Sequence, residues 1–220
     1  MSPKQFLARL SAVQIKNTFN PYSELCSVYD IPGACNIRSE VLLAMLERAC
    51  LTEIDAIWIG RDLGHRGGRR TGLALTDDVN VVNHARRWQI DIPRSTRGTP
   101  IAEKTASVIW GALEKIPENI FLWNVFPLHP FLKDEPFSNR SHNAAERVIG
   151  EEILNELVKM LNPRRVLAIG NDAENSAIRI CSDRPIVKLR HPSYGGQNIF
   201  QNQIEDLYKI IINDKQRDLF

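Results

Sequence analysis

Polar residues with catalytic chemistry follow three short apolar runs of the chain. Asp62 follows residues 54–59, Asn124 is the last residue but one of the run at 120–125, and His191 follows residues 186–189. A carboxylate can stabilise a developing cation, an amide can read the edge of a ligand, and an imidazole can donate to a leaving group. If the runs are parallel strands, their carboxyl ends meet at one sheet edge, and we expect the three side chains to converge there. Each residue alone could instead have a structural role. Asp62 could be a helix cap or turn residue, Asn124 a turn former, and His191 a histidine whose hydrogen bonds are made within the fold.

The stretch from residue 60 to residue 78, GRDLGHRGGRRTGLALTDD, combines glycine and arginine directly after the first of these runs. Glycine lets a backbone approach a ligand closely or adopt positive φ. Arginine suits a ligand that carries phosphates. The stretch lacks the lysine-threonine ending of a P-loop and the spacing of a dinucleotide fingerprint, which disfavours nucleotide hydrolysis.

The elements that must position these residues alternate between strand-like and helix-like patterns. We expect strands at 54–59, 120–125, 166–169 and 186–189, and helices at 37–51, 79–88, 101–116, 142–162 and 197–212, with a short helix after Gly170. Ser141 is the expected cap of the long helix and Pro163 its stop. This alternation predicts an α/β protein, a three-layer α/β/α sandwich with a central, mainly parallel four-stranded sheet. We expect one domain over residues 1–220, with residues 1–50 as a helical leading segment.

Composition narrows the class of protein further. The chain has 220 residues, 43% of them hydrophobic and 25% charged, and a net charge of only +2, with arginines clustered locally. Local clusters suit a protein that tracks a nucleic-acid backbone, with solvated surface charge as the alternative. No apolar run reaches the roughly 18 residues that span a bilayer, so we expect no membrane partner. We expect a monomer.

The cysteines and histidines offer weaker alternatives. Cys26, Cys35, Cys50 and Cys181 lack C-x-x-C spacing and follow no recognisable targeting segment, so reduced thiols and a cytoplasmic location are expected. A cluster held by the first three cysteines is an alternative. A second alternative is a metal site formed by His65 and His129 beside Asp62 and Asn124, although their spacings match no common ligand pattern. We therefore expect no metal and no cofactor.

Three motifs together resemble one family, the uracil-DNA glycosylase superfamily. Gly60-Arg61-Asp62 with the later GLA run at 72–74 resembles its water-activating motif, closest to that of the family-one enzymes. Residues 122–125, LWNV, resemble its pocket-lining strand, and residues 191–193, HPS, resemble the start of its histidine loop. The motifs occur in the family's order, and the resemblance spans roughly residues 54–212.

The resemblance implies hydrolysis of the bond between a flipped-out base and deoxyribose in DNA. Asp62 would stabilise the sugar cation or orient water, His191 would donate to the departing base, and Asn124 would read its pairing edge. No lysine occupies a motif position, so no lyase step through a Schiff base is implied. The base pocket would comprise Arg61, Gly64, Leu75 and Asn124, and the DNA contacts would come from Arg69, Arg70, Ser193 and Tyr194.

Departures from the family pattern bear on the substrate. Gly64 stands where family-one enzymes have a tyrosine beside the pyrimidine C5 atom, and Leu75 replaces a phenylalanine that stacks on the base. Gly195 stands where the family has a leucine that wedges into the DNA stack in place of the flipped nucleotide. The space in the stack would then be filled by Tyr194, Gln197 or a residue of the 127–140 loop. Gly64 predicts space beside C5, unless another side chain such as His65 or an arginine refills it.

Four functions follow as alternatives. The first is a monofunctional glycosylase for a damaged or 5-modified pyrimidine, including a bulky modified cytosine in phage DNA, in repair or antiviral defence. Asn124 does not separate uracil from cytosine, because a flipped amide suits either base. The others are a plain uracil-DNA glycosylase, a non-catalytic nucleic-acid-binding module on the same scaffold, and a hydrolase of free nucleosides.

Overall fold

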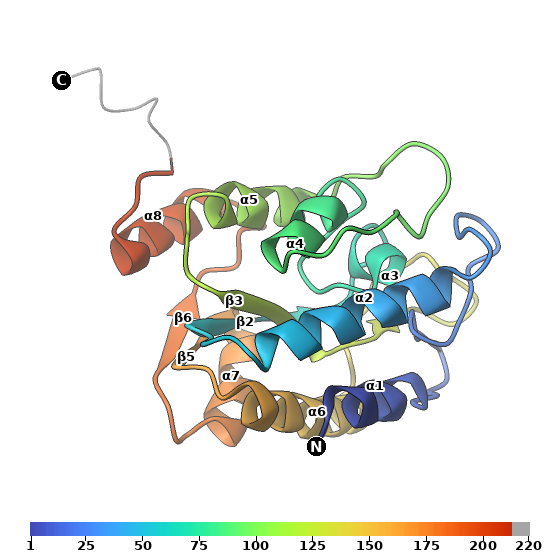
Figure 1. Cartoon of the computed structure of the whole chain (residues 1–220), viewed down its shortest axis with the longest axis horizontal. Coiled ribbons are helices and arrows are strands. Elements are labelled where there is room, and N and C mark those ends of the chain that lie inside the picture. The colour runs from blue at the N-terminus through green and yellow to red at the C-terminus, as the bar shows by residue number, and fades with distance from the viewer. Residues whose placement is uncertain (213–220) are drawn as a thin grey trace.

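The computed structural model describes residues 1–212, and a parallel sheet lies at its centre (Figure 1). The four-stranded sheet has the order β3-β2-β5-β6 and comprises β2 (Ala56–Asp62), β3 (Ile120–Phe126), β5 (Arg165–Ile169) and β6 (Ile186–Leu189). Every residue of β3 is buried, as are the first five of β2. Strands covered on both faces need apolar residues at successive positions, which explains the continuous apolar runs in the sequence.

Helices cover both faces of the sheet. One apolar cluster joins α5 (Lys104–Leu113) and α8 (Gln197–Tyr208) to the sheet. A second cluster lies on the opposite side and includes α6 (Ala144–Leu161) and α7 (Asn171–Ile180). Figure 1 shows α5 and α8 above the strands and α6 and α7 below them. The three-layer α/β/α sandwich is therefore confirmed.

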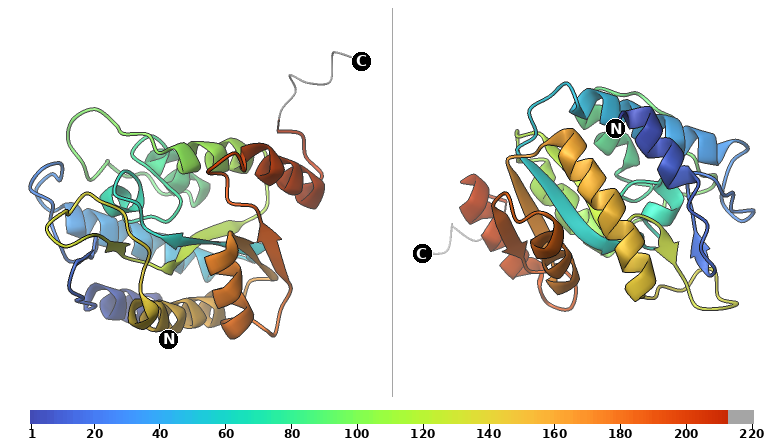
Figure 2. Two further views of the ribbon diagram at one scale, coloured as in Figure 1. Left: turned by 180° about the vertical axis from the view of Figure 1, so that it is seen from behind. Right: turned by 90° about the horizontal axis from the view of Figure 1, so that it is seen from below.

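The remaining elements complete the second cluster and one end of the molecule. They are α1 (Pro3–Ser11), α2 (Ala34–Ala49), α3 (Gly68–Thr71), α4 (Val81–Arg87) and a small antiparallel pair, β1 (Thr18–Phe19) with β4 (His129–Pro130). Figure 2 shows α1 and α6 lying side by side across one face of the sheet. Within residues 1–212, no helix combines the length and the apolar character needed to cross a membrane.

The long helix begins later than the sequence pattern predicted. Its cap is Asn143 and not Ser141, because the Asn143 side chain accepts the backbone N–H of Glu146 at 3.0 Å. The Glu146 carboxylate accepts the Asn143 N–H at 2.7 Å in return, a reciprocal capping box. The helix ends one residue before Asn162, whose φ of 43° lies in the left-handed region, and Pro163 follows. The prediction of Ser141 as cap is therefore wrong.

Residues of the leading segment pack against the glycine-rich loop. The buried Arg38 guanidinium donates to the Pro21 carbonyl at 2.6 Å and to the Arg70 carbonyl at 3.3 Å. The Tyr22 hydroxyl donates to the Gly72 carbonyl at 2.5 Å. These bonds connect residues before α2 and on α2 to the loop that follows β2.

The order of the strands creates a crevice at one end of the sheet. β3 pairs with one side of β2 and β5 with the other, so the chain reverses direction across the sheet at β2. In open α/β folds, ligands bind outside the carboxyl ends of the strands at such a switch point. The carboxyl ends of β2, β5 and β6 are therefore the expected position of a site.

Candidate active site

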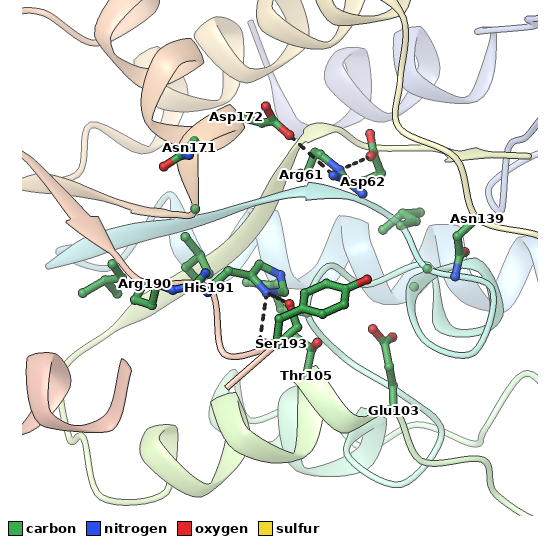
Figure 3. A pocket seen from close by; sticks show the side chains of 18 of the residues that line it. Arg61, Asp62, Glu103, Thr105, Asn139, Asn171, Asp172, Arg190, His191 and Ser193 are labelled. Carbon is green, nitrogen blue, oxygen red and sulfur yellow. Dashed lines mark hydrogen bonds and ion pairs between the residues drawn. The ribbon is translucent and has the colours of Figure 1, made fainter. Parts of the chain in front are cut away.

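A cavity of about 490 Å³ opens at the carboxyl ends of β2, β5 and β6. Asp62, at the end of β2, and His191, which follows β6, both line it. Figure 3 shows these two side chains around one space, with Ser193, Thr105 and Glu103 along its lower side. The volume lies within the range of small-molecule sites, roughly 300–1,000 Å³. The structure thus brings together the acid and the imidazole that are far apart in the sequence.

Two donors hold the Asp62 carboxylate. Arg61 donates its Nε–H to Oδ2 at 2.8 Å, and His142 Nδ1 lies 2.5 Å from Oδ1. The side chains of Asp62 and His142 are only 7% and 8% exposed. Because both oxygens accept hydrogen bonds, the carboxylate is fixed in orientation and is better suited to stabilising positive charge than to abstracting a proton.

His142 is a member of the site that the sequence did not indicate. It precedes the Asn143 cap of α6, and its ring lies 6.0 Å from the Phe126 ring at the end of β3. The late start of α6 leaves His142 outside the helix, where its side chain reaches Asp62. A signal for this position would have been the capping pair of Asn143 and Glu146, which fixes where the helix begins.

The tautomer of His191 follows from its hydrogen bonds. The Ser193 backbone N–H donates to His191 Nδ1 at 3.2 Å, and the Ser193 hydroxyl lies 2.7 Å from the same nitrogen. Burial lowers the pKa of His191 below its ordinary value, and the positive charges of Arg61 and Arg190 lower it further. Neutral His191 therefore carries its proton on Nε2, which makes that nitrogen a donor.

Asn124 lies in the sheet beside Gly60 and does not line the cavity. Its side chain is buried, and neither Oδ1 nor Nδ2 has a hydrogen-bond partner within residues 1–212. A Cβ placed on Gly60 would lie 2.4 Å from Asn124 Oδ1 and 2.8 Å from a methyl carbon of Leu75. Leu75 does line the cavity, with a left-handed φ of 55°. The unpaired amide thus lies close to the cavity, with Leu75 beside it.

The space beside Gly64 is occupied by a side chain that the sequence did not suggest. The Glu103 carboxylate lies 3.3 Å from the position that a Cβ of Gly64 would take. Neither His65 nor an arginine makes that contact; the His65 backbone N–H donates to Asn139 Oδ1 at 3.0 Å. Gly64 and Glu103 both line the cavity, so an acid, and not open space, lies beside Gly64.

Arg69 and Arg70 do not reach the surface, so the structure does not support the prediction that they contact DNA. Arg69 is 4% exposed, donates to the Tyr29 hydroxyl at 2.9 Å and lies over the Phe19 ring. Arg70 is 5% exposed and pairs with Asp78 at 2.7 Å. Both guanidinium groups are held inside the fold by aromatic, hydroxyl and carboxylate partners.

The loop after β6 presents its residues differently. Ser193 is engaged with His191, whereas Tyr194 is 97% exposed at the cavity rim. Tyr194 and Gly195 have left-handed φ values of 51° and 74°. This turn carries the tyrosine side chain out into solvent.

The remaining candidates have structural roles. His129 is buried, with Arg69 2.9 Å from Nδ1 and the Ser138 carbonyl 2.9 Å from Nε2. No three histidine, cysteine, aspartate or glutamate side chains in the described part of the chain form a group that could hold a metal ion. The cysteines at 26, 35, 50 and 181 are free thiols.

Comparisons with known proteins place this geometry in a family. The model of the uracil DNA glycosylase superfamily matches residues 50–213. The crystal structure of wild-type SMUG2 from Pedobacter heparinus is similar in fold, with a TM-score of 0.62 and 14% sequence identity over 93% of this chain and 96% of that one.

Wild-type UNG from Nitratifractor salsuginis has 16% identity over 93% of this chain and 94% of that one, with a TM-score of 0.43. A search of curated protein sequences found no match. The family match covers most of the chain and includes the span, roughly residues 54–212, over which the sequence motifs resemble the family. The chain therefore belongs to the uracil DNA glycosylase superfamily, whose members are DNA glycosylases.

Proposed function

We propose that the chain is a monofunctional DNA glycosylase that hydrolyses the N-glycosidic bond of a flipped-out pyrimidine and leaves an abasic site. The observation that carries the proposal is the meeting of Asp62 and His191 in one cavity at the sheet edge. We further propose that the base is damaged or 5-modified, including bulky modified cytosine of phage DNA, and that the role is repair or antiviral defence. We also propose that the protein acts as a monomer, because Asp62 and His191 of a single chain line the same cavity.

The reaction follows from the donors and charges of the cavity. As the bond between C1′ and the base nitrogen breaks, its electrons move onto the base, and His191 Nε2–H donates to the base oxygen where negative charge develops. A preorganised donor of this kind is worth about 3 kcal/mol of barrier. The Asp62 carboxylate stabilises the positive sugar and orients the water whose oxygen bonds to C1′. The water proton leaves with the base or to solvent.

Asn124 supplies the recognition of the base in this proposal. A buried amide without hydrogen-bond partners is costly in the empty site, and a base that offers both a donor and an acceptor removes that cost. Asn124 does not line the cavity, whereas Leu75 beside it does, so we propose that Leu75 shifts as the base enters and then contacts its face.

A lyase step requires a free amine at the sugar. Lys188 lines the cavity, but its Nζ pairs with Glu174 at 2.7 Å. We therefore propose hydrolysis alone. Reduction with borohydride during turnover should leave no covalent complex between protein and DNA.

The test is a mass-spectrometric screen for bases released from DNAs of different modification, with Asp62→Asn as the paired variant. Wild-type release of a pyrimidine, with loss of release but retained DNA binding in Asp62→Asn, supports the proposal. Uracil alone as product favours the plain uracil-DNA glycosylase. Binding without release from any DNA favours the non-catalytic module, and equal turnover of the matching free nucleoside favours a nucleoside hydrolase.

A further inference from the structure

Glu103 directs its side chain into the cavity and away from the helix that it begins. It is the N-cap residue of α5, yet its side chain makes no capping hydrogen bond. Its backbone N–H donates to Asp77 Oδ2 at 2.6 Å, which fixes the start of the helix. Figure 3 shows the Glu103 carboxylate pointing into the space that Thr105, Ser193 and His191 also border.

The chain leaves room for this carboxylate by placing glycines against it. A Cβ on Gly67 would lie 2.0 Å from Glu103 Oε2, and a Cβ on Gly64 would lie 3.3 Å from the same oxygen. Any side chain at Gly67 would therefore displace the acid from its position. Two glycines of the loop after β2 shape a wall of the cavity whose functional group is the carboxyl of Glu103.

The carboxylate has no partner of its own. Within residues 1–212 neither oxygen of Glu103 accepts a hydrogen bond or forms an ion pair, and the residue is only partly exposed to solvent. Burial, and secondly the charge of Asp77, raise the pKa of Glu103 above its ordinary value. A partly desolvated acceptor without a donor is unfavourable, and a ligand that brings a donor relieves the cost.

We propose, on the basis of the glycosylase function above, that Glu103 accepts a hydrogen bond from a donor on the C4–C5 edge of the bound pyrimidine. Two groups supply a donor on that edge, the amino group at C4 of a cytosine and a hydroxyl on the C5 substituent. The O4 atom of uracil and a C5 methyl group supply none. Glu103 is thus a specificity-determining residue, which selects for a base that carries such a donor.

Glu103 and Asn124 can together recognise the amino group of a cytosine. The cytosine amino group has two N–H bonds, one on the N3 side and one on the C5 side. Asn124, whose amide is unpaired, can accept from the first and donate to N3, and Glu103 accepts from the second. The amide alone suits uracil as well as cytosine, whereas a carboxylate on the C5 side favours the base with the amino group.

Four duplexes of one sequence test the inference, each with a single cytosine or uracil carrying either a methyl or a hydroxymethyl group at C5. Base release is measured in single turnover for the wild type, Glu103→Ala, Glu103→Gln and the control Glu114→Ala. Glu114 is the exposed residue that caps the other end of α5. Thermal unfolding of each variant establishes that it is folded.

Glu103→Ala should lower the wild-type preference for the donor-bearing base by about tenfold or more, because a hydrogen bond to a charged group is lost. Glu103→Gln should keep part of the preference, since its amide oxygen still accepts, and Glu114→Ala should match the wild type. Loss of the preference for cytosine over uracil identifies the amino group as the donor. Loss of the preference for hydroxymethyl over methyl identifies the hydroxyl.

An active wild type whose two preferences are unchanged in Glu103→Ala overturns the role of Glu103 and leaves the glycosylase function intact. The same conclusion follows if the wild type releases only the base with O4 and a C5 methyl group. Failure of the folded wild type to release any base from these duplexes or from the DNAs of the wider screen counts instead against the glycosylase function itself.

Discussion

Replacing His142 with alanine tests how much its hydrogen bond to Asp62 contributes to base release. The Asp62 carboxylate accepts from Arg61 at 2.8 Å and from His142 at 2.5 Å, and the substitution removes the second donor while the first remains. A hydrogen bond to a charged group is worth about 1.5–3 kcal/mol. Because Arg61 still holds one oxygen, we expect about 1–2 kcal/mol of this to be lost at the transition state. At about 1.4 kcal/mol per factor of ten, base release should slow about 5- to 30-fold.

A double-mutant cycle distinguishes this role from a general loss of structure. Asp62→Asn alone should slow release by about 10²–10³-fold, the range for one electrostatic group at a reacting centre. If His142 acts through Asp62, the double variant should be no slower than Asp62→Asn, since the partner of His142 is already changed.

The assay is single-turnover release from a duplex identified in the screen, with abasic sites cleaved by alkali and resolved on a denaturing gel. Ser141→Ala, at the exposed residue just before His142, serves as the matched control and should match the wild type. Wild-type rates in His142→Ala, or losses that multiply in the double variant, would refute the reasoning.

Three further predictions concern the rim, the packing behind the cavity and the response to acid. Tyr194 is 97% exposed, so Tyr194→Ala should leave the free energy of unfolding unchanged. Because stacking is worth about 1–3 kcal/mol per base, the substitution should slow base release from duplex DNA by about tenfold more than release from single strands. Equal losses on both DNAs would contradict a stacking role. Gly60→Ala should destabilise the fold by about 1–3 kcal/mol through overpacking. Gly111→Ala should instead stabilise α5 by about 0.5–1 kcal/mol, because the added carbon meets no atom within 4 Å beyond its own stretch of helix. Equal urea unfolding midpoints for the two variants would show that packing is not the cause. Burial lowers the pKa values of His84 and His129 to about 3, so below about pH 6.5 the unfolded chain binds protons that the folded chain does not. As the pH is lowered below about 6.5, the free energy of unfolding should therefore decrease by up to about 1.4 kcal/mol per pH unit for each histidine. A free energy of unfolding that stays constant between about pH 7.5 and about pH 5 would contradict this.

The sheet could be predicted from the sequence because its strands are buried on both faces. Residues 120–125 read as one apolar run, and the structure has a fully buried strand at Ile120–Phe126. The small pair β1 and β4 was not predicted, since two-residue strands have no periodicity to detect. Helix starts differed by a few residues because caps, and not apolar spacing, decide them.

The site could be predicted only where it lies on strand ends. Asp62 and His191 follow strands, so topology alone brings them to one edge. His142 and Glu103 precede helices, so the contact of His142 with Asp62 and the place of Glu103 at the cavity depend on how α6 and α5 are packed. The capping pair of Asn143 and Glu146 indicates where α6 begins, but nothing in the local sequence shows that His142 contacts Asp62 or that Glu103 lines the cavity.

Buried arginines were the main misinterpretation. An arginine in a glycine-rich loop suits a phosphate, but the same group also suits a carboxylate or an aromatic ring inside the protein. Arg70 has Asp78 as partner and the Tyr29 ring beneath it at 4.2 Å. Whether such partners lie within reach depends on contacts between distant segments, which one sequence does not display.

The inward direction of Arg38, Arg69 and Arg70 determines how strongly salt should affect complex formation. These cations are enclosed. Of the lysines and arginines that line the cavity in the described part of the chain, Arg61, Arg140 and Lys188 each pair with a carboxylate, which leaves Arg190 as the one without an ion pair to displace counterions from a DNA strand. Each neutralised phosphate contributes about −0.9 to the slope of log affinity against log salt concentration. We expect a slope of only about −1 to −3, so recognition would depend on the fit of one extruded nucleotide more than on attraction along the backbone. A much steeper slope in a fluorescence-anisotropy titration would show that another surface of the chain gathers phosphates.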